Sequence, residues 1–452
     1  MEPVHTCKLF GAIRAILGIK NALPIIHGPA GCSYHIRYLL GLRSGSNLQL
    51  CSTELTQEDV VFGAEEKLSH TILEADNLYS PDLIVVLSSC STSLIGENIF
   101  RVAKECKPKI KSEIIAISAG GFEGDQTDGY IEVMMALIEW SISKIKLDNS
   151  NEESLNSLKN NYLAADRFKK RIPAVNETNK PHILESDTQL RKNKIFPHRN
   201  KFLNLIGIFR GGFDLFNLKK TLKRMGVTLN CVLTAGSTLE DLKRIHRANL
   251  NYSLCDISGI EPSLLLKERF STEFMHYPFP LGFSNSYNFF KNIIDFLEIE
   301  YSLENEKNEY YGVMKNYKDK LAGYKVAIIA GPTRGTALMD FTIELGMKPV
   351  LISLDLLGSY TMENLNKIIV DCDVSPGDKP EILQKPDLMQ IRDLINHSKP
   401  DLIVGGMGEL GLSNEFEIPL LDVMHAQEIT MGWEGAVKTA ENIYDVLDSG
   451  QK

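Results

Sequence analysis

The stretch Asp82-Leu-Ile-Val-Val-Leu-Ser-Ser-Cys-Ser-Thr92 decides the fold class of this chain. Its first half is a short apolar run rich in β-branched residues, which is typical of a strand that is buried on both faces of a parallel sheet. Its second half is a loop of small residues, and a helical pattern follows it over about residues 93–105. A buried strand, a short loop and a covering helix form the repeating unit of parallel α/β sheets.

The same unit recurs along the chain in three blocks. The first block adds a predicted strand at 114–118 and a helix at 130–145. The second has strands at 203–209, 227–233 and 250–254, with helices at 214–225 and 238–247. The third has strands at 324–330, 349–354, 401–404 and 419–423, with a closing helix at 435–447. The sequence therefore predicts three doubly wound α/β domains.

Two polar stretches separate these blocks. Residues 151–200 are rich in Lys and Asn and have no clear period, so we expect a linker with one helix near 153–170. Residues 304–320 read as a charged helical connector. The expected domains are then 1–150, 201–302 and 303–452.

Composition excludes several classes of protein. The 452 residues include 49 Lys plus Arg and 58 Asp plus Glu, a formal charge of −9 that disfavours nucleic-acid binding. No apolar run approaches the ~20 residues that cross a bilayer, so we expect no membrane association. The first residues lack the pattern of a secretory signal, and a cytoplasmic location is expected. No phosphate-binding G-x-x-x-x-G-K-[ST], HExxH or hydrolase triad pattern is present.

The eight cysteines form no CxxC pair, so any metal site must gather cysteines that are distant in sequence. Cys32 follows the strand-like run Leu23-Pro-Ile-Ile26, and Cys90 and Cys255 follow predicted strands. All three lie in loops at the ends of strands, where parallel sheets bind ligands. The alternative for each is a small buried hydrophobic side chain. Three further cysteines lie within predicted elements and are interpreted as packing residues: Cys106, Cys231 and Cys372. Cys51 is ambiguous.

Three segments resemble the nitrogenase component 1 superfamily: Thr6-Cys-Lys-Leu-Phe-Gly-Ala12 through His27-Gly-Pro-Ala-Gly-Cys32, Thr53 to Leu68, and Ser88 to Asn98. The resemblance implies that Cys7, Cys32 and Cys90, spaced by 25 and 58 residues, ligate an iron–sulfur cluster of the 4Fe-4S or P-cluster type. It also implies a homologous partner subunit, in a homo- or hetero-oligomer, that completes the site. A separate ATP-hydrolysing iron protein would supply the electrons.

The resemblance implies a second site in a cavity between the three domains. Cys255 is similar to the cysteine that caps one end of the family's large metal cofactor, and His425 lies near the histidine that holds the other end. The gap from His425 to the Gly432-Trp-Glu-Gly435 turn is shorter than in true nitrogenase, and a structural histidine is the alternative. Arg334 would line the cavity and balance an anionic cluster, or else face solvent at a helix start.

One departure from the family concerns protons. Residues 119–129 lack the histidine that helps to deliver protons in nitrogenase, and they offer Glu123, Asp125 and Asp128 instead. Carboxylates relay protons when burial raises their pKa, but in loops they are more often solvated. Dinitrogen is therefore not the expected substrate.

Two main functions follow from the resemblance. The first is a subunit of a nitrogenase-like reductase that passes electrons through the interface cluster to a larger metal cofactor or a substrate near Cys255, with Glu123, Asp125 and Arg334 as candidate catalytic residues. The second is a scaffold that builds an iron–molybdenum-type cofactor and releases it. A metal-free α/β sugar- or nucleotide-binding protein is the distant third.

Overall fold

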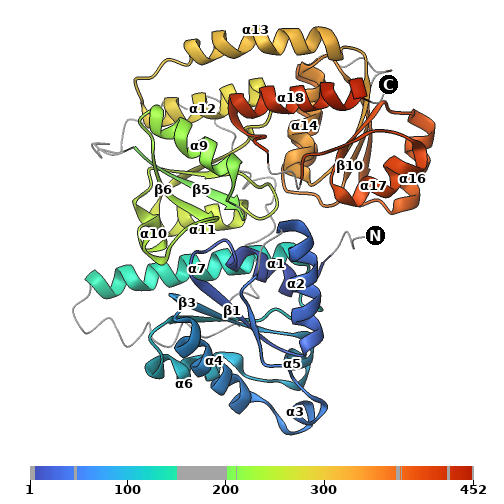
Figure 1. Ribbon diagram of the computed structural model, residues 1–452. Coiled ribbons are helices and arrows are strands. Elements are labelled where there is room, and N and C mark those ends of the chain that lie inside the picture. The colour runs from blue at the N-terminus through green and yellow to red at the C-terminus, as the bar shows by residue number, and fades with distance from the viewer. Residues whose placement is uncertain are drawn as a thin grey trace.

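The structure is a computed structural model that describes residues 6–44, 48–149, 201–209, 211–372, 377, 379–424 and 428–449. Three parallel sheets, each flanked by helices, follow one another along the chain (Figure 1). The predicted fold class is therefore confirmed. No described helix has the length and apolar character needed to cross a membrane. The predicted helix at 153–170 and the 151–200 linker lie outside the described residues.

The first sheet has the strand order β2-β1-β3-β4. Its strands are β1 (Ala22–His27), β2 (Cys51–Ser52), β3 (Leu83–Ser88) and β4 (Glu113–Ile117). The alternation of side chains along β3 divides its apolar residues between two cores. Leu83, Val85 and Leu87 pack in the core that contains α1 (Lys8–Ile16) and α7 (Gln126–Asn149). Ile84 and Val86 face α4 (Glu65–Tyr79) and α6 (Ile99–Cys106).

Three further helices complete the first domain: α2 (Ala30–Ser44), α3 (Gln57–Phe62) and α5 (Cys90–Ile95). The predicted helix at 93–105 is wrong in one respect, because the chain forms two helices, α5 and α6, in this region. Gly96 ends α5 in the left-handed conformation with φ 79°, and the Asn98 side chain accepts the Arg101 N–H to cap α6. A positive φ at glycine followed by an asparagine cap is a common way to break a helix.

The second sheet has the order β6-β5-β7-β8. Its strands are β5 (Phe202–Ile208), β6 (Thr228–Thr234), β7 (Leu250–Ser253) and β8 (Glu273–His276). Its helices are α9 (Phe213–Arg224), α10 (Leu239–Lys243), α11 (Ile260–Phe270) and α12 (Phe283–Leu297). Short 3-10 turns occur here and in the other two domains: η1 (Lys107–Lys109), η6 (Ile245–Arg247) and η8 (Met407–Glu409).

The third sheet has the order β11-β10-β9-β12-β13. Its strands are β9 (Lys325–Ala330), β10 (Lys348–Leu354), β11 (Glu381–Gln384), β12 (Leu402–Gly405) and β13 (Leu420–Asp422). Its helices are α14 (Pro332–Glu344), α15 (Thr361–Asp371), α16 (Leu388–Ser398), α17 (Leu410–Phe416) and α18 (Gly432–Ser449), and α13 (Glu304–Leu321) precedes it.

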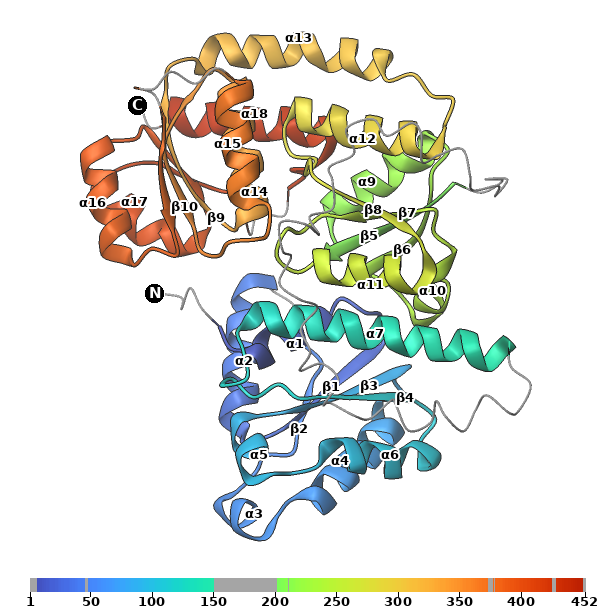
Figure 2. The same cartoon turned by 180° about the vertical axis from the view of Figure 1, so that it is seen from behind.

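The three domains are joined by two shared apolar cores. One continuous core runs from the second sheet into the third and includes Phe289, Phe341 and Trp433. Another joins α7 of the first domain to Leu242 and Leu266 of the second, and α7 lies between these two domains in both views (Figures 1 and 2). The second domain therefore packs against both of the other domains through shared apolar cores.

Candidate metal centre and cavity site

Cys7, Cys32 and Cys90 each stand at the beginning of a helix. Cys7 is the N-cap of α1, Cys32 is the third residue of α2, and Cys90 is the first residue of α5. The last two follow the carboxyl ends of the neighbouring strands β1 and β3. A helix N-terminus carries partial positive charge, which stabilises a thiolate or an anionic cluster nearby.

Gly121 brings two of these cysteines together. Its backbone N–H donates to Cys90 Sγ over 3.1 Å. A Cβ atom placed on Gly121 would lie 3.2 Å from Cys7 Cβ and 3.2 Å from Cys90 Sγ, a tight contact that the absence of a side chain at this glycine avoids. Burial raises the pKa of the Cys32 thiol, and the charges of Cys7 and Cys90 raise it further. The three predicted cysteines therefore lie near one another at the edge of the first sheet, and their role as ligands of one cluster stays a prediction.

Three thiols are the kind of donor that iron–sulfur clusters take, and the binding of a cluster at this site stays a prediction. In the described part of the chain, no three His, Cys, Asp or Glu side chains are placed to bind one metal ion. A cluster of several irons takes thiolates that are farther apart than the ligands of one ion, and thiolates are its usual ligands. The absence of a side chain at Gly121 and the exposure of Cys7 and Cys90 fit a bulky group that a second protein also contacts.

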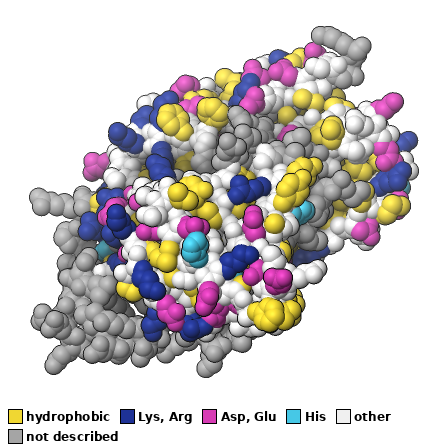
Figure 3. All heavy atoms as spheres, turned by 60° about the horizontal axis from the view of Figure 1, so that its bottom comes forward, with side chains coloured by type: hydrophobic (Ala, Val, Ile, Leu, Met, Phe, Trp, Pro, Cys, Tyr) yellow, Lys and Arg dark blue, Asp and Glu magenta, His cyan; other side chains and the backbone are white. Residues whose placement is uncertain are grey.

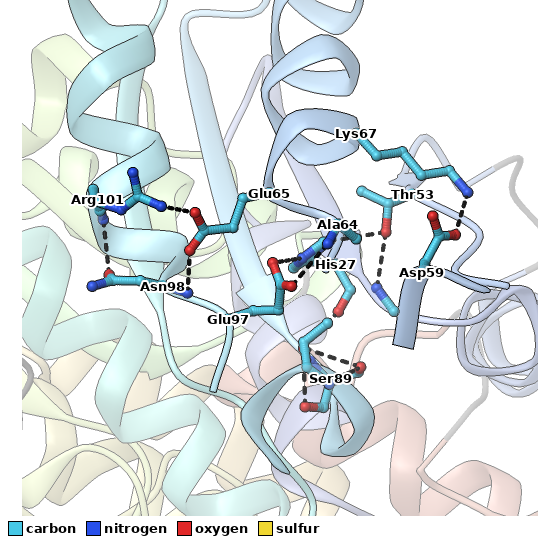
Figure 4. Close-up of polar contacts among 12 residues, drawn as sticks. His27, Thr53, Asp59, Ala64, Glu65, Lys67, Ser89, Glu97, Asn98 and Arg101 are labelled. Atoms are coloured by element: carbon cyan, nitrogen blue, oxygen red, sulfur yellow. Dashed lines mark hydrogen bonds and ion pairs between the residues drawn. The ribbon is translucent and has the colours of Figure 1, made fainter. Parts of the chain in front are cut away.

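A buried polar network holds the cysteine loops in place, and the sequence interpretation missed it (Figure 4). His27 is fully buried; its Nδ1 lies 3.1 Å from Thr53 Oγ1 and its Nε2 lies 3.3 Å from Glu97 Oε2. The His27 carbonyl accepts the Ser89 N–H over 3.1 Å and the Thr92 hydroxyl over 2.9 Å. His27 therefore connects the loop that leads to Cys32 with the helix that begins at Cys90.

Glu97 extends this network to helix α3. Its Oε1 accepts the N–H of Ala64, just beyond the end of α3, over 2.8 Å. Helix α3 begins with a capping box formed by Thr56 and Asp59, and Lys67 pairs with Asp59 at 2.7 Å. With both ends fixed, α3 presents Phe62 with 87% of its surface exposed.

Exposed apolar side chains lie on the first domain, three of them within four residues of Cys32, Cys90 or Gly121 in the sequence. We call Tyr34, Val61, Phe62, Leu94 and Phe122 the first-domain apolar surface. Tyr34 follows Cys32 by two residues, Leu94 follows Cys90 by four, and Phe122 follows Gly121 directly. Figure 3 looks onto the end of the first domain, where such side chains lie among charges of both signs. Exposed apolar patches are typical of protein-interaction surfaces.

Glu123 and Asp125 lie beside this site but have structural partners. Glu123 accepts the Ser118 hydroxyl over 2.9 Å and pairs with Lys8 at 3.4 Å. Asp125 forms a β-bridge with Cys7, and its Oδ1 accepts the Thr127 N–H over 2.7 Å at the start of α7. Both carboxylates therefore help to hold the segments around Cys7, and their role as proton donors stays a prediction.

Cys255 lies at the end of β7, between the second and third domains. A Cβ on Gly207 would lie 2.7 Å from Cys255 Cβ, so β5 approaches this residue closely. The Ser258 N–H donates to Cys255 Sγ over 3.4 Å. Next to it, a cavity of about 10 Å³, lined by Asp256, His276 and Thr333 among others, has room for roughly one water.

Arg334 is half-buried and faces the second domain rather than solvent. It donates to Asp214 Oδ2 over 3.1 Å and to Thr430 Oγ1 over 2.9 Å. Its guanidinium also lies 5.3 Å from the centre of the Phe279 ring. Arg334 lies in the first turn of α14, directly after Thr333, whose Oγ1 accepts the Asp256 N–H over 2.9 Å. Its predicted role, to line a cofactor cavity and balance an anionic cluster, stays a prediction. His425 lies outside the described residues.

A wider open groove of about 460 Å³ lies where α9, α13 and the start of α18 meet. Aromatic and acidic side chains line it, including Phe213, Tyr310 and Glu434. Glu434 also accepts the Asn217 amide over 3.1 Å, so this groove borders the contact between the second and third domains.

Comparison with known proteins agrees with this arrangement. The chain is 25% identical to the nitrogenase iron-molybdenum cofactor biosynthesis protein NifE of Methanosarcina barkeri, over 97% of this chain and 87% of that protein. It is also 25% identical to the nitrogenase molybdenum-iron protein alpha chain of Methanothermobacter thermautotrophicus, over 97% and 86%. A structure titled nitrogenase Cp1 at pH 6.5 superposes with a TM-score of 0.77 at 19% identity, covering 99% of this chain and 93% of that one, and shows the shared fold. The model of nitrogenase component 1 type oxidoreductases matches residues 7–448, so the chain belongs to that family.

Proposed function

We propose that this chain is a subunit of the electron-accepting component of a nitrogenase-like reductase. Cys7, Cys32 and Cys90 would hold an iron–sulfur cluster, of the 4Fe-4S or P-cluster type, through which electrons enter. The observations that carry the proposal are the approach of Cys7 and Cys90 at Gly121 and the electrostatic influence of both on the Cys32 thiol, with each of the three at a helix N-terminus. The cluster would supply the redox chemistry, and the protein would hold it and tune its charge.

Two partners follow from this proposal. Three cysteines leave a four-ligand site incomplete, and a homologous component 1 subunit, as a second copy or a related chain, would supply the rest. The exposure of Cys7 and Cys90 beside the first-domain apolar surface supports a subunit interface there. An ATP-hydrolysing iron protein would deliver the electrons, because this chain has no phosphate-binding loop of its own.

The second site would lie near Cys255, Arg334 and His425. Cys255 has the donor chemistry for a metal cofactor, and its loop contacts the start of α14, where Arg334 is located. A larger metal cofactor or the substrate itself would bind here. The residue of this chain with the clearest role is Cys255, whose thiol would anchor the group.

Iron analysis tests the first site. We expect the anaerobically purified protein to contain iron and sulfide, and Cys90→Ala to lose most of both. Cys372→Ala is the matched control, since Cys372 is also exposed but lies at the end of α15 in the third domain. Full iron content in Cys90→Ala, or a folded wild-type protein without iron, would contradict the proposal.

The alternative is a scaffold for the biosynthesis of an iron–molybdenum-type cofactor, as the name of the Methanosarcina barkeri relative indicates for that protein. One observation favours it: Asp214 already compensates the charge of Arg334, which weakens the attraction for an anionic cofactor. A scaffold would lose its second-site metal to an acceptor protein during gel filtration, whereas a catalytic subunit would retain it. In either case, Cys255→Ala should release the second-site metal and leave the spectrum of the interface cluster unchanged.

A further inference from the structure

One buried carboxylate ties the loop after Cys255 to the third domain. Asp256 is 3% exposed, and its Oδ1 accepts the Tyr360 N–H over 3.1 Å. Its Oδ2 accepts the Thr361 hydroxyl over 2.5 Å, and its own N–H donates to Thr333 Oγ1 over 2.9 Å. All three partners belong to the third domain, although Asp256 follows β7 of the second.

The backbone of the third domain is shaped for this contact. A Cβ on Gly358 would lie 2.2 Å from Asp256 Oδ2, so any other residue there would push the carboxylate away. The Gly358 N–H donates to Thr361 Oγ1 over 2.8 Å, which orients the hydroxyl that Asp256 accepts. These contacts form a specific socket for the Asp256 side chain.

The second domain fixes the other side of the same loop. Gly207 lies against Cys255 Cβ, and the Gly259 N–H donates to the Cys255 carbonyl over 3.0 Å. The Cys255 thiol therefore belongs to a loop that both domains hold, and Asp256 is the side chain that joins it to the third.

A packing role alone does not account for a carboxylate at this position. Burying a charge is costly, and apolar residues of similar size commonly fill such a space at lower free energy. Beside Asp256, His276 Nε2 lies 3.5 Å from Oδ1 without a hydrogen-bond partner, and the His276 ring is tilted by 37° to the Tyr360 ring, with 5.5 Å between the ring centres. The site keeps this polar arrangement despite its cost, which indicates a requirement for a fixed geometry.

We propose that Asp256 is a positioning residue that holds the Cys255 thiol in a fixed relation to the third domain, through its bonds to Thr361 and Tyr360. The inference deepens the proposed function, because it assumes that Cys255 anchors the group bound at the second site. The group would then contact a thiol from one domain and side chains from the next, in one constant geometry.

Thr361 allows a test that leaves Cys255 and Asp256 intact. Thr361→Val keeps the shape of the side chain and removes the hydroxyl, whereas Thr361→Ser keeps the hydroxyl. The full-length protein is treated anaerobically with N-ethylmaleimide, and labelling of the Cys255 peptide is followed by mass spectrometry. We expect the labelling rate to rise about tenfold in Thr361→Val, as the loss of a hydrogen bond to a charged group frees the loop, and to stay near wild type in Thr361→Ser.

Two controls separate positioning from general destabilisation. Thr342→Val removes another fully buried hydroxyl of the third domain, one that donates within α14, and should leave Cys255 labelling unchanged. Labelling of exposed Cys372 should be equal in all variants. If Thr361→Val does not fold, Asp256→Asn replaces it, since the amide cannot accept both bonds, and the same tenfold rise is expected. Equal labelling of Cys255 in the valine and serine variants would overturn the inference.

The labelling result is independent of the proposed second site. If Cys255→Ala retained all second-site metal, the proposed site would fail while Asp256 could still position the loop. If Thr361→Val and Thr361→Ser gave equal Cys255 labelling rates while Cys255→Ala lost that metal, the positioning role of Asp256 would be refuted and the proposed second site would stand.

Discussion

Replacing Glu97 with alanine would show how much the polar network below the cysteine loops stabilises the first domain. The Glu97 side chain is 6% exposed and contacts His27 Nε2 and the Ala64 N–H. Burial lowers the pKa of His27 although the hydrogen bond with Glu97 opposes this, so the ring is neutral at pH 7 and has one N–H. Because a carboxylate only accepts, that hydrogen lies on Nε2 and points at Glu97.

The expected loss of stability follows from the two buried donors that would lose their acceptor, the His27 Nε2–H and the Ala64 N–H. An unpartnered buried donor costs about 1–3 kcal/mol, so Glu97→Ala should lower the free energy of unfolding of the first domain by about 2–6 kcal/mol. Glu97→Gln retains one acceptor oxygen and should lose about half as much. Glu105→Ala is the control, since this exposed residue pairs only with Arg101 at 3.3 Å and should cost under about 0.5 kcal/mol.

Tryptophan fluorescence can follow unfolding at α7 of the first domain. The chain has two tryptophans. Trp140 lies in α7 of the first domain and Trp433 in α18 of the third. In a Trp433→Phe background, urea unfolding reports on Trp140, and at a slope of about 2 kcal/mol per M the alanine variant should shift the midpoint by about 1–3 M. A shift no larger than that of Glu105→Ala would refute the reasoning.

Three further predictions concern the same structure. Gly129→Ala would place a Cβ 2.1 Å from the Lys8 carbonyl and so push α7 away from α1. This variant should lower the free energy of unfolding, measured with urea, by about 1–3 kcal/mol and should lower the iron content. Burial raises the pKa of Glu113, but hydrogen bonds from its two lysine partners overcome this and hold the pKa at about 2. The ionised carboxylate should therefore stabilise the folded protein by about 1.5–3 kcal/mol above pH 4.5, and this contribution is lost as the pH falls toward 2. In acid unfolding, Glu113→Gln should abolish this pH-dependent loss. Asp214→Asn leaves Arg334 uncompensated and should slow the release of second-site metal during dialysis about tenfold.

Matched variants check these predictions. Gly312→Ala, on α13 with open space around it, should preserve or raise stability and leave iron unchanged. Asp241→Asn, in the capping box of α10, should not alter metal release. Equal behaviour of a variant and its control would contradict the corresponding prediction.

The fold could be predicted because its evidence is local. The apolar runs that become β3 and β9, and the loops of small residues after them, are continuous in sequence and buried throughout or nearly so. β8 and β11 were missed because they are edge strands whose side chains are only partly buried, so they lack a continuous apolar run. The break between α5 and α6 depended on Gly96, and a glycine in a helical pattern is a weak signal by itself.

The supporting residues of both sites could not be predicted in this way. His27 and Glu97 are 70 residues apart, and Asp256 and Thr361 are 105 apart. Such pairs depend on which strands become neighbours in the sheets, and neither member has a local pattern that names its partner. Glu97 directly follows the small-residue turn at Gly96, and Asp256 directly follows a loop cysteine, so their positions beside candidate ligands were the only available signal.

The charges around the second site bear on the choice between enzyme and scaffold. A permanently bound anionic cofactor requires uncompensated positive charge, because the attraction must exceed the cost of removing the cofactor from water. Among the described residues near Cys255, Arg334 is paired with Asp214, and the nearest carboxylate, Asp256, is buried and accepts hydrogen bonds from the third domain. The Cys255 thiol therefore provides a fixed anchor, and the nearby Arg334 adds little net positive charge to it. This combination suits a group that binds through one covalent contact and later leaves, which favours the scaffold alternative for the second site while the interface cluster serves either function.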